Sequence, residues 1–263
     1  MTAILDLRRE VAKSIPLRLP GLGDISASDL AAAREHWRIH MVAEFASARV
    51  FSGLVPQLMA AELDFDYVRA ATEMALQEID HGLLSARVFA ALGGDPRSEL
   101  PSLDPVPMHA DVPAVEAALR NVISISCSGE TLAVAVIGGE RERATSHELR
   151  AVLTQILSDE VGHARFGWRL LAEVAPSLGE DALRRTSAYL VAVFERDLRG
   201  MRGCLGMSPV SDAALGLGAP DGPAQWACFW ATMTSVTIPG LERFGLKAEW
   251  AWARAQERVI ARD

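Results

Sequence analysis

Two copies of the pattern Glu-x-x-His constrain this chain more than any other feature. Glu78-Ile79-Asp80-His81 and Glu160-Val161-Gly162-His163 each lie in a long apolar segment. Side chains three residues apart lie on nearly the same face of an α-helix, so the carboxylate and the imidazole of each copy can reach one point. A chain of this composition would carry roughly 0.4 such patterns by chance. Two copies near the middle of apolar helices therefore indicate a shared metal site.

Two isolated glutamates extend the pattern. Glu44 lies in the unpolar sequence MVAEFASA, and Glu130 lies in CSGETLAVAV. Glu44 precedes Glu78 by 34 residues and Glu130 precedes Glu160 by 30, enough for the chain to run along one helix and return to the same level on the next. Four buried carboxylates would be strongly destabilising unless cations, or arginine at helix surfaces, neutralised them. Two divalent cations would balance four carboxylates.

Helical periodicity runs through most of the chain, and strand-like alternation is nearly absent. Residues 95 to 111 contain four prolines and predict a long connection. On either side of it we expect two helices: from near Ser28 toward Pro56, from Asp64 or Asp66 to Gly93-Gly94, from Asp111 to Gly138-Gly139, and from a capping box at Thr145-x-x-Glu148 to about Pro176. Two helix pairs and one crossover describe a four-helix bundle.

The whole chain is therefore expected to be all-α and to form a single helical domain over residues 1–263. Residues 1–27 would form an N-terminal arm, 28–175 the four-helix bundle, and 176–263 additional helices. The last part contains a fifth helix near Gly179 to Arg202, a Gly- and Pro-rich loop over 203–224, and a tail with four tryptophans. Such tryptophans pack in a core, form an oligomer contact, or cover a pocket.

Composition excludes several kinds of partner. The net charge of −8 and the pI near 5.3 argue against nucleic acid and against an anionic membrane. We find no signal peptide and no long uninterrupted apolar run, so we expect no membrane span. The three cysteines lack CxxC spacing, which fits a reducing cytoplasm. A homodimer remains open.

The order Glu, Glu-x-x-His, Glu, Glu-x-x-His resembles the ligand set of the ferritin-like di-iron carboxylate superfamily, over residues 28–175. The resemblance implies two iron ions, or manganese in their place. It implies the following metal ligands, which would also be the catalytic residues: Glu44, Glu78, His81, Glu130, Glu160 and His163. It also implies that Asp159 hydrogen-bonds a ligating histidine of the other helix pair, with Gln77 at the equivalent position. His40, one turn before Glu44, is an extra ligand, a hydrogen-bond donor to a ligand, or a packing residue above the site.

Two positions differ from the residues typical of particular subfamilies of this superfamily. Ala133 stands where rubrerythrins carry an additional glutamate, and Ser85 stands where radical-generating reductase subunits keep a tyrosine. Small residues beside the lone glutamates suggest a substrate pocket between the first and third helices, although close helix packing would use the same residues. These residues are Ser47, Ala48, Ser126, Cys127 and Ala133. For Cys127, the role of a small buried hydrophobe is the competing interpretation.

The resemblance to the oxygenase branch implies an enzyme that uses O2 to oxidise a small or medium organic substrate by hydroxylation, N-oxygenation, desaturation or aldehyde cleavage. No flavin or nicotinamide motif is present, so electrons would come from an external donor such as a reductase or ferredoxin. A ferritin-like ferroxidase without organic substrate is the alternative. A third hypothesis is a binding protein that holds manganese or zinc without redox work.

Overall fold

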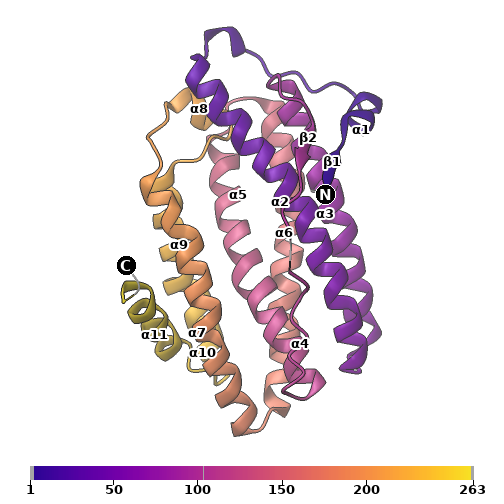
Figure 1. Ribbon diagram of the computed structural model, residues 1–263, viewed down its shortest axis with the longest axis vertical. Helices are drawn as coiled ribbons and strands as arrows, with labels where there is room; N and C mark the ends of the chain where they lie inside the picture. Colours follow the sequence, from indigo (N-terminus) through magenta and orange to yellow (C-terminus); the bar gives the residue numbers. More distant parts are fainter. Residues whose placement is uncertain (1–2, 103, 262–263) are drawn as a thin grey trace.

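Four long antiparallel helices form the centre of the molecule, as the sequence predicts. The computed structural model describes residues 3–102 and 104–261. The bundle consists of α2 (Ala27–Ala60), α3 (Phe65–Ala91), α6 (His147–Val174) and a continuous third helix made of α4 (Ala114–Val122), the π-helical segment η2 (Ile123–Glu130) and α5 (Thr131–Arg143). Figure 1 shows α2 beside α3, with α5 beside α6. The all-α, ferritin-like architecture with a crossover between the second and third helices is thus confirmed.

Shorter elements surround the bundle. Three elements precede α2: β1 (Ile4–Asp6), α1 (Arg8–Lys13) and η1 (Leu22–Asp24). The crossover between α3 and α4 contains β2 (Arg97–Glu99). After the bundle come η3 (Ala175–Ser177), α7 (Glu180–Arg202), η4 (Gly203–Gly206), α8 (Asp212–Gly216), α9 (Gly222–Thr232), η5 (Met233–Thr237), α10 (Ile238–Glu242) and α11 (Ala248–Ile260). Helices α7, α9, α10 and α11 of this second group lie along the flank of the bundle opposite α2 and α3, whereas α8 contacts α2 (Figure 1).

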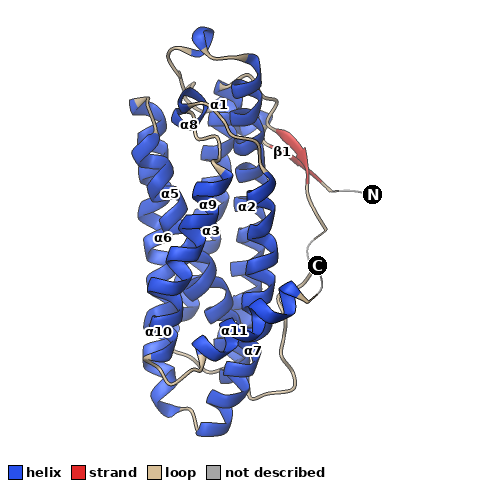
Figure 2. Ribbon diagram, turned by 90° about the vertical axis from the view of Figure 1, so that its left-hand side faces the viewer, coloured by secondary structure: helices blue, strands red, loops and turns tan. Residues whose placement is uncertain are grey.

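The two short strands are an addition that the sequence did not reveal. β1 and β2 pair antiparallel, with Ile4 opposite Glu99, and the buried Leu5 anchors β1 to the core. Figure 2 shows β1 on the side of the elongated bundle. The pairing ties the N-terminal arm to the crossover. Three residues per strand are too few to produce a readable alternation of apolar and polar side chains.

Two predicted helix ends were wrong, each for a local reason. The cap of α6 is Ser146, whose hydroxyl accepts from the N–H of Leu149, whereas the hydroxyl of Thr145 donates to the carbonyl of Gly216. The third bundle helix continues past Gly138-Gly139 to Arg143. It continues because Glu140, one residue beyond the glycine pair, turns inward and is buried.

The hydrophobic core is divided into two clusters, one toward each end of the bundle. One contains Phe51, Leu58, Phe166 and their neighbours. The other contains Trp37, Met41, Leu84, Phe89 and Leu153. The six candidate metal ligands occur in the sequence between these two sets on all four helices. A polar layer is therefore enclosed between two apolar ones, which lowers the local dielectric and strengthens electrostatic interactions there.

One helical stretch, Ala114–Arg143, is long and apolar enough to cross a membrane by length and composition alone. We did not expect any stretch to reach this length. In the structure it is the third helix of the bundle, and its Glu116 is buried and paired with Arg120 and Arg185. Its apolar character is that of a helix packed among other helices.

The tryptophan-rich tail packs against the outside of the bundle core. Trp252 is buried and contacts the rings of Phe194, Phe229 and Trp230. Trp250 is half exposed. These contacts are those of core packing, which was the first of the three interpretations of the tail tryptophans.

Close packing of α6 against η2 gives a stability prediction. A Cβ atom on Gly167 would lie 2.5 Å from the Cβ of Ser126 and 3.0 Å from the backbone nitrogen of Cys127. We expect Gly167→Ala to lower the free energy of unfolding by about 1–3 kcal/mol because the backbone of η2 must move. Thermal or urea denaturation of metal-free protein measures this.

Gly138→Ala is the matched control. Nothing lies within 4 Å of a Cβ at Gly138, so alanine there should leave stability unchanged or raise it slightly. If the two variants unfold alike, α6 and η2 are not packed as closely as described.

Candidate metal centre

The six candidate ligands come from all four bundle helices. Glu44 lies on α2, Glu78 and His81 on α3, and Glu160 and His163 on α6. Glu130 is the last residue of the π-helical segment η2, where the hydroxyl of Thr131 donates to the carbonyl of Ser126. A π-turn holds an additional residue and changes the direction of the side chains that follow, and such turns are frequent at functional sites.

The two histidines present the same nitrogen to the glutamates. Nδ1 of His81 lies 3.2 Å from Oε1 of Glu160. Nδ1 of His163 lies 3.1 Å from Oε1 of Glu78 and 3.4 Å from Oε2 of Glu160. The rings of His81 and His163 are 5.9 Å apart between centroids. Both imidazoles thus face one shared space between α3 and α6.

Inside this space, buried polar atoms lack hydrogen bonds. Both carboxylate oxygens of Glu78, Oε2 of Glu160, and Nδ1 of His81 and of His163 have no hydrogen-bond partner. These four side chains are at most 2% exposed. Unsatisfied buried polar atoms are costly, yet these are close enough to one another to share a cation. The residues therefore fit a metal centre.

The ligand atoms fall into two overlapping groups, each within 4.8 Å. One contains Glu44, Glu78, His81 and Glu160, and the other contains Glu78, Glu130, Glu160 and His163. Glu78 and Glu160 belong to both groups, so they are suited to bridge two ions. Each ion would have one histidine and one terminal glutamate of its own, and carboxylate and imidazole together suit iron, manganese or zinc.

The second ring nitrogen of each histidine, Nε2, contacts a side chain on the other of the two helices α3 and α6. Nε2 of His81 lies 3.1 Å from Oδ2 of Asp159, and Nε2 of His163 lies 2.9 Å from Oε1 of Gln77. The amide of Gln77 also donates to Asp159 over 3.3 Å. Such contacts fix the tautomer and ring orientation, leaving Nδ1 free for a metal. Asp159 on α6 thus orients the histidine of α3, and Gln77 on α3 orients that of α6.

In the metal-free protein, protons are held where cations would bind. Burial and the charges of Glu160 and Glu44 raise the pKa of Glu78 to about 8, and burial raises the pKa of Glu130 well above its usual value. Burial lowers the pKa of each histidine, but the charges of the close glutamates outweigh it and raise the pKa of His81 and of His163 to about 9. Burial opposes ionisation of Glu160, yet the close imidazoles of His163 and His81 depress its pKa strongly.

His40 lies beside this centre and is not part of either ligand group. Its Nδ1 is 3.5 Å from Oε1 of Glu44. Burial lowers the pKa of His40, but the hydrogen bond to Glu44 and the charges of Glu140, Glu44 and Glu160 raise it to about 9. This position fits a hydrogen bond to a candidate ligand, which is one of the three roles considered for His40.

Glu140 is a residue near the centre that sequence reasoning missed. It is 1% exposed and lies 3.1 Å from Nε2 of His36. We interpreted the preceding glycine pair as the end of the helix, which placed Glu140 in a turn. Extending the helix by one turn puts Glu140 on the face of Glu130 and Ile137, and that periodicity is the signal that could have found it.

A cavity of about 350 Å³ opens directly on the candidate ligands. Its walls come from α2, α3, η2, α5 and α6, and it is lined by His40, Glu44, Ser47, Glu78, Gly129, Glu130, Leu132, Ala133, Val136, Ile137 and Glu160. Ser47 and Ala133 were among the small residues expected to line a pocket. Ala48, Ser126 and Cys127 were also expected there but do not line it, because they are buried in helix contacts. Burial raises the pKa of the Cys127 thiol, which fits a small hydrophobic role.

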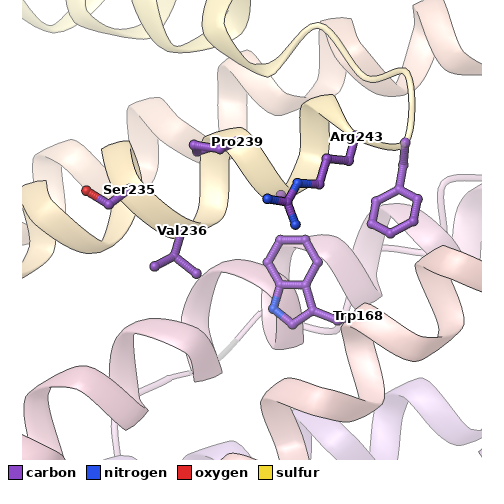
Figure 3. A pocket seen from close by; sticks show the side chains of 7 residues that line it. Trp168, Ser235, Val236, Pro239 and Arg243 are labelled. Atoms are coloured by element: carbon purple, nitrogen blue, oxygen red, sulfur yellow. The ribbon is translucent and has the colours of Figure 1, made fainter.

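A second cavity, of about 410 Å³, lies between α6 and the η5–α10 segment. Figure 3 shows Trp168 and Arg243 facing each other across it, and Val236 and Pro239 form its apolar wall. No candidate metal ligand lines it. Although this cavity is larger, its distance from the polar layer makes the smaller one the better candidate for chemistry.

Comparison with known proteins supports the fold. No protein-family model matches the chain, and no curated protein matches its sequence. Among solved structures, the chain is similar to "Protein 19 with aldehyde deformylating oxidase activity from Synechococcus", with a TM-score of 0.60 and 18% sequence identity. The match covers 90% of this chain and 98% of that one. At this identity the likeness shows the architecture alone: the chain has the ferritin-like helical bundle fold.

Proposed function

We propose that the protein is a di-iron oxidoreductase that uses O2 to oxidise a small or medium neutral organic molecule. The observation that carries the proposal is a cavity of about 350 Å³ that is lined by the four glutamates of the six-ligand cluster. Two iron ions held there would supply the electrons that reduce O2. A ligand set without an adjoining cavity would bind metal equally well but would leave no place for an organic substrate.

The six candidate ligands would have different roles in holding the metal ions. Glu78 and Glu160 would bridge the two ions, Glu44 and Glu130 would each bind one ion, and the histidines would anchor one ion each. Asp159 and Gln77 hold the imidazole rings in place through Nε2. Carboxylates can change between terminal and bridging binding, whereas the oriented imidazoles keep each ion in position.

The cavity lining indicates the kind of substrate. Leu132, Val136 and Ile137 form an apolar wall on α5, opposite the carboxylates. Among the described residues, neither lysine nor arginine lines this cavity. A carboxylate or phosphate would find no lysine or arginine to pair with there, so a neutral molecule with an apolar body fits better. The named activity of the structurally similar protein makes aldehydes the first candidates to test, beside amines and hydrocarbons.

The overall reaction needs electrons that the substrate alone does not always supply. For hydroxylation, O2, a C–H bond, two electrons and two protons give the alcohol and one water. The donor would be a separate reductase or ferredoxin, and a reducing cytoplasm would suit the three free cysteines. The acidic charge of the chain, −8, would favour a donor with a basic docking face.

The decisive experiment loads metal-free protein anaerobically with two ferrous ions per chain and then mixes it with O2 in a stopped-flow spectrometer. We expect an optical transient whose decay accelerates when a suitable neutral substrate is present, with product formed in the same mixture. Iron that oxidises and mineralises at the same rate with every candidate substrate would favour the ferroxidase. Protein that does not react with O2 when loaded would favour a binding role.

Filling the cavity should separate substrate oxidation from metal binding. We expect Ala133→Leu to reduce substrate oxidation about 10-fold or more, because the added methyl groups occupy space beside Glu130. Two irons per chain and the oxidation of iron by O2 should remain. Single-turnover product analysis together with iron analysis measures both.

Ala172→Leu, on the exposed face of α6, is the matched control and should behave as the unaltered protein. Full substrate oxidation in Ala133→Leu would place the substrate elsewhere, for example in the cavity beside Trp168.

A further inference from the structure

A second cluster of metal-binding side chains lies above the six-ligand centre. His36 and His40 are one turn apart on α2, and their rings are 4.4 Å apart between centroids. Glu140 approaches them from α5. One ligand atom from each of these three residues lies within 4.8 Å of the other two. None of the three belongs to the six-ligand set.

His36 and Glu140 are close without being hydrogen-bonded. Nε2 of His36 is 3.1 Å from Oε1 of Glu140, yet neither this nitrogen nor either oxygen of Glu140 has a hydrogen-bond partner. Both side chains are more than nine-tenths buried. The atoms are at hydrogen-bond distance but are not directed along the line between them. Two donors bound to one ion at about 2.1 Å lie roughly 3 Å apart when the angle at the ion is near 90°.

The six-ligand centre shows the same combination of features. There too, imidazole nitrogens lie between 3.1 and 3.4 Å from carboxylate oxygens, and several of these buried atoms make no hydrogen bond. A buried polar atom without a hydrogen bond costs free energy unless another group, such as a cation, binds to it. A simple ion pair between His36 and Glu140 would direct the N–H toward the carboxylate, which is not the observed arrangement.

We propose that His36, His40 and Glu140 form a third metal site, separate from the two-metal centre, that binds one divalent transition metal ion. Two imidazoles and one carboxylate are the donors that ferrous iron and zinc accept in sites with open positions. His40 directs Nδ1 toward Glu44, so its Nε2 is the nitrogen left for the ion. Water from the adjoining cavity, which His40 lines, would fill the remaining positions.

Charge sets the expected order of affinities. The two-metal centre offers four carboxylates for two ions, whereas the third site offers only Glu140 for one ion. Arg143, one turn beyond Glu140, adds a positive charge that acts on both His36 and Glu140. The third ion should therefore bind more weakly than the first two. Through His40 and Glu44 it would adjoin the two-metal centre without sharing a ligand with it.

The test uses zinc, which needs no oxygen-free handling. We expect metal-free protein titrated with Zn²⁺ to bind two equivalents tightly and a third more weakly. Crystals soaked in Zn²⁺ should show three anomalous peaks, one of them between His36 and Glu140. This measurement on the unaltered chain does not depend on whether any variant folds.

Variants of the proposed ligands test whether the third equivalent of zinc binds at this site. Glu140→Gln and His36→Gln should each weaken it roughly 100-fold or more, since even the loss of a group that only orients a ligand costs 10- to 100-fold. The first two equivalents should be retained. Glu142→Gln, on the exposed side of α5, is the matched control and should still bind three. Circular dichroism establishes that each variant is folded.

Two results would overturn the third site, and they differ from failure of the proposed function. Two zinc peaks, both at the six-ligand cluster, would leave the di-metal centre intact and remove the third site. Three equivalents that persist unchanged in Glu140→Gln and His36→Gln would place the third ion elsewhere. Loss of all tight binding in the unaltered protein would instead remove the di-metal centre, and with it the proposed oxidoreductase.

Discussion

Replacing Glu160 by glutamine is expected to abolish tight metal binding at both positions and also to destabilise the metal-free protein. Glu160 belongs to both ligand groups, so its loss removes a donor from each ion. We expect both affinities to fall by more than about 100-fold. In the metal-free protein, the close approach of the imidazoles of His163 and His81 outweighs burial and holds the pKa of Glu160 far below its usual value. Glutamine cannot carry that negative charge, so two buried imidazoles lose their counter-ion.

Replacing Glu130 by glutamine should have the opposite effect on stability. Glu130 belongs to one ligand group only, so one tightly bound metal should remain. Burial and the charges of Glu160, Glu78 and Glu44 raise its pKa well above the usual value, which means that its ionised form is unfavourable in the metal-free fold. Folding therefore requires Glu130 to take up a proton, a cost that a neutral isostere does not carry, so the metal-free variant should unfold at a higher temperature than the unaltered protein.

The pair of variants is measured by metal analysis after dialysis and by thermal unfolding with a chelator present. Glu148→Gln, exposed at the start of α6, is the control and should keep two metals and normal stability. Equal metal loss in Glu160→Gln and Glu130→Gln would mean that Glu160 does not bridge. Equal stability changes would mean that the charge distribution in the metal-free centre differs from the one described.

The sequence predicted the parts of the fold that depend on helical periodicity. The third and fourth residues along a helix return to the same face, so the Glu-x-x-His patterns and the apolar positions around them specify where α3 and α6 face. Antiparallel pairing then follows from the spacing between Glu44 and Glu78 and between Glu130 and Glu160. The all-α bundle and its crossover required nothing beyond these local rules.

Features that depend on a distant partner could not be predicted. Thr145 was expected to cap α6, but Gly216 at the end of α8 offers its carbonyl to that hydroxyl, and Ser146 caps the helix instead. Glu140 looked like the start of a turn because Gly138-Gly139 precedes it, and only the approach of His36 on α2 explains its burial. Local sequence contains neither partner, so tertiary contacts decided both outcomes.

The lining of the cavity beside the candidate ligands was also predicted only in part. Ser47 and Ala133 were chosen for being small and one turn from a lone glutamate, and both line the cavity. Ser126 satisfied the same criterion but faces Gly167 on α6, because the π-turn of η2 changes the register of side chains before Glu130. A π-turn has no reliable sequence signature, so regular helical spacing misplaces the residues within it.

The stability gained on binding metal is expected to increase between pH 6 and pH 8. In the metal-free fold the pKa of His81 and of His163 is about 9 and that of Glu78 is about 8. Unfolding lowers these values to those of free side chains, about 6.5 for histidine and 4.3 for glutamate. The metal-free fold therefore binds more protons than the unfolded chain in this range. Because the state that holds more protons is weakened by their removal, the stability of the metal-free fold must fall as pH rises from 6 toward about 9.

The metal-bound fold has the opposite dependence on protons at these groups. A cation requires neutral imidazole and ionised carboxylate, so binding releases the protons that His81, His163 and Glu78 carry near pH 7. Affinity then rises with pH, by up to about tenfold per pH unit for each proton released. The stability gained on binding is set by this affinity, so the gap between the metal-bound and metal-free protein should increase with pH.

Thermal unfolding with Zn²⁺ and with a chelator, at pH 6, 7 and 8, measures this difference, and titration calorimetry in buffers of different ionisation enthalpy counts the released protons. We expect the gap in unfolding temperature to widen at each step and more than one proton to be released per chain at pH 7. In His81→Gln/His163→Gln the gap itself should largely disappear, since each ion loses its imidazole ligand. A gap that stays constant from pH 6 to pH 8 would mean that binding releases no protons, so that His81, His163 and Glu78 carry none in the metal-free protein. In that case the network that joins Glu160 to both imidazoles would not be an ionic one.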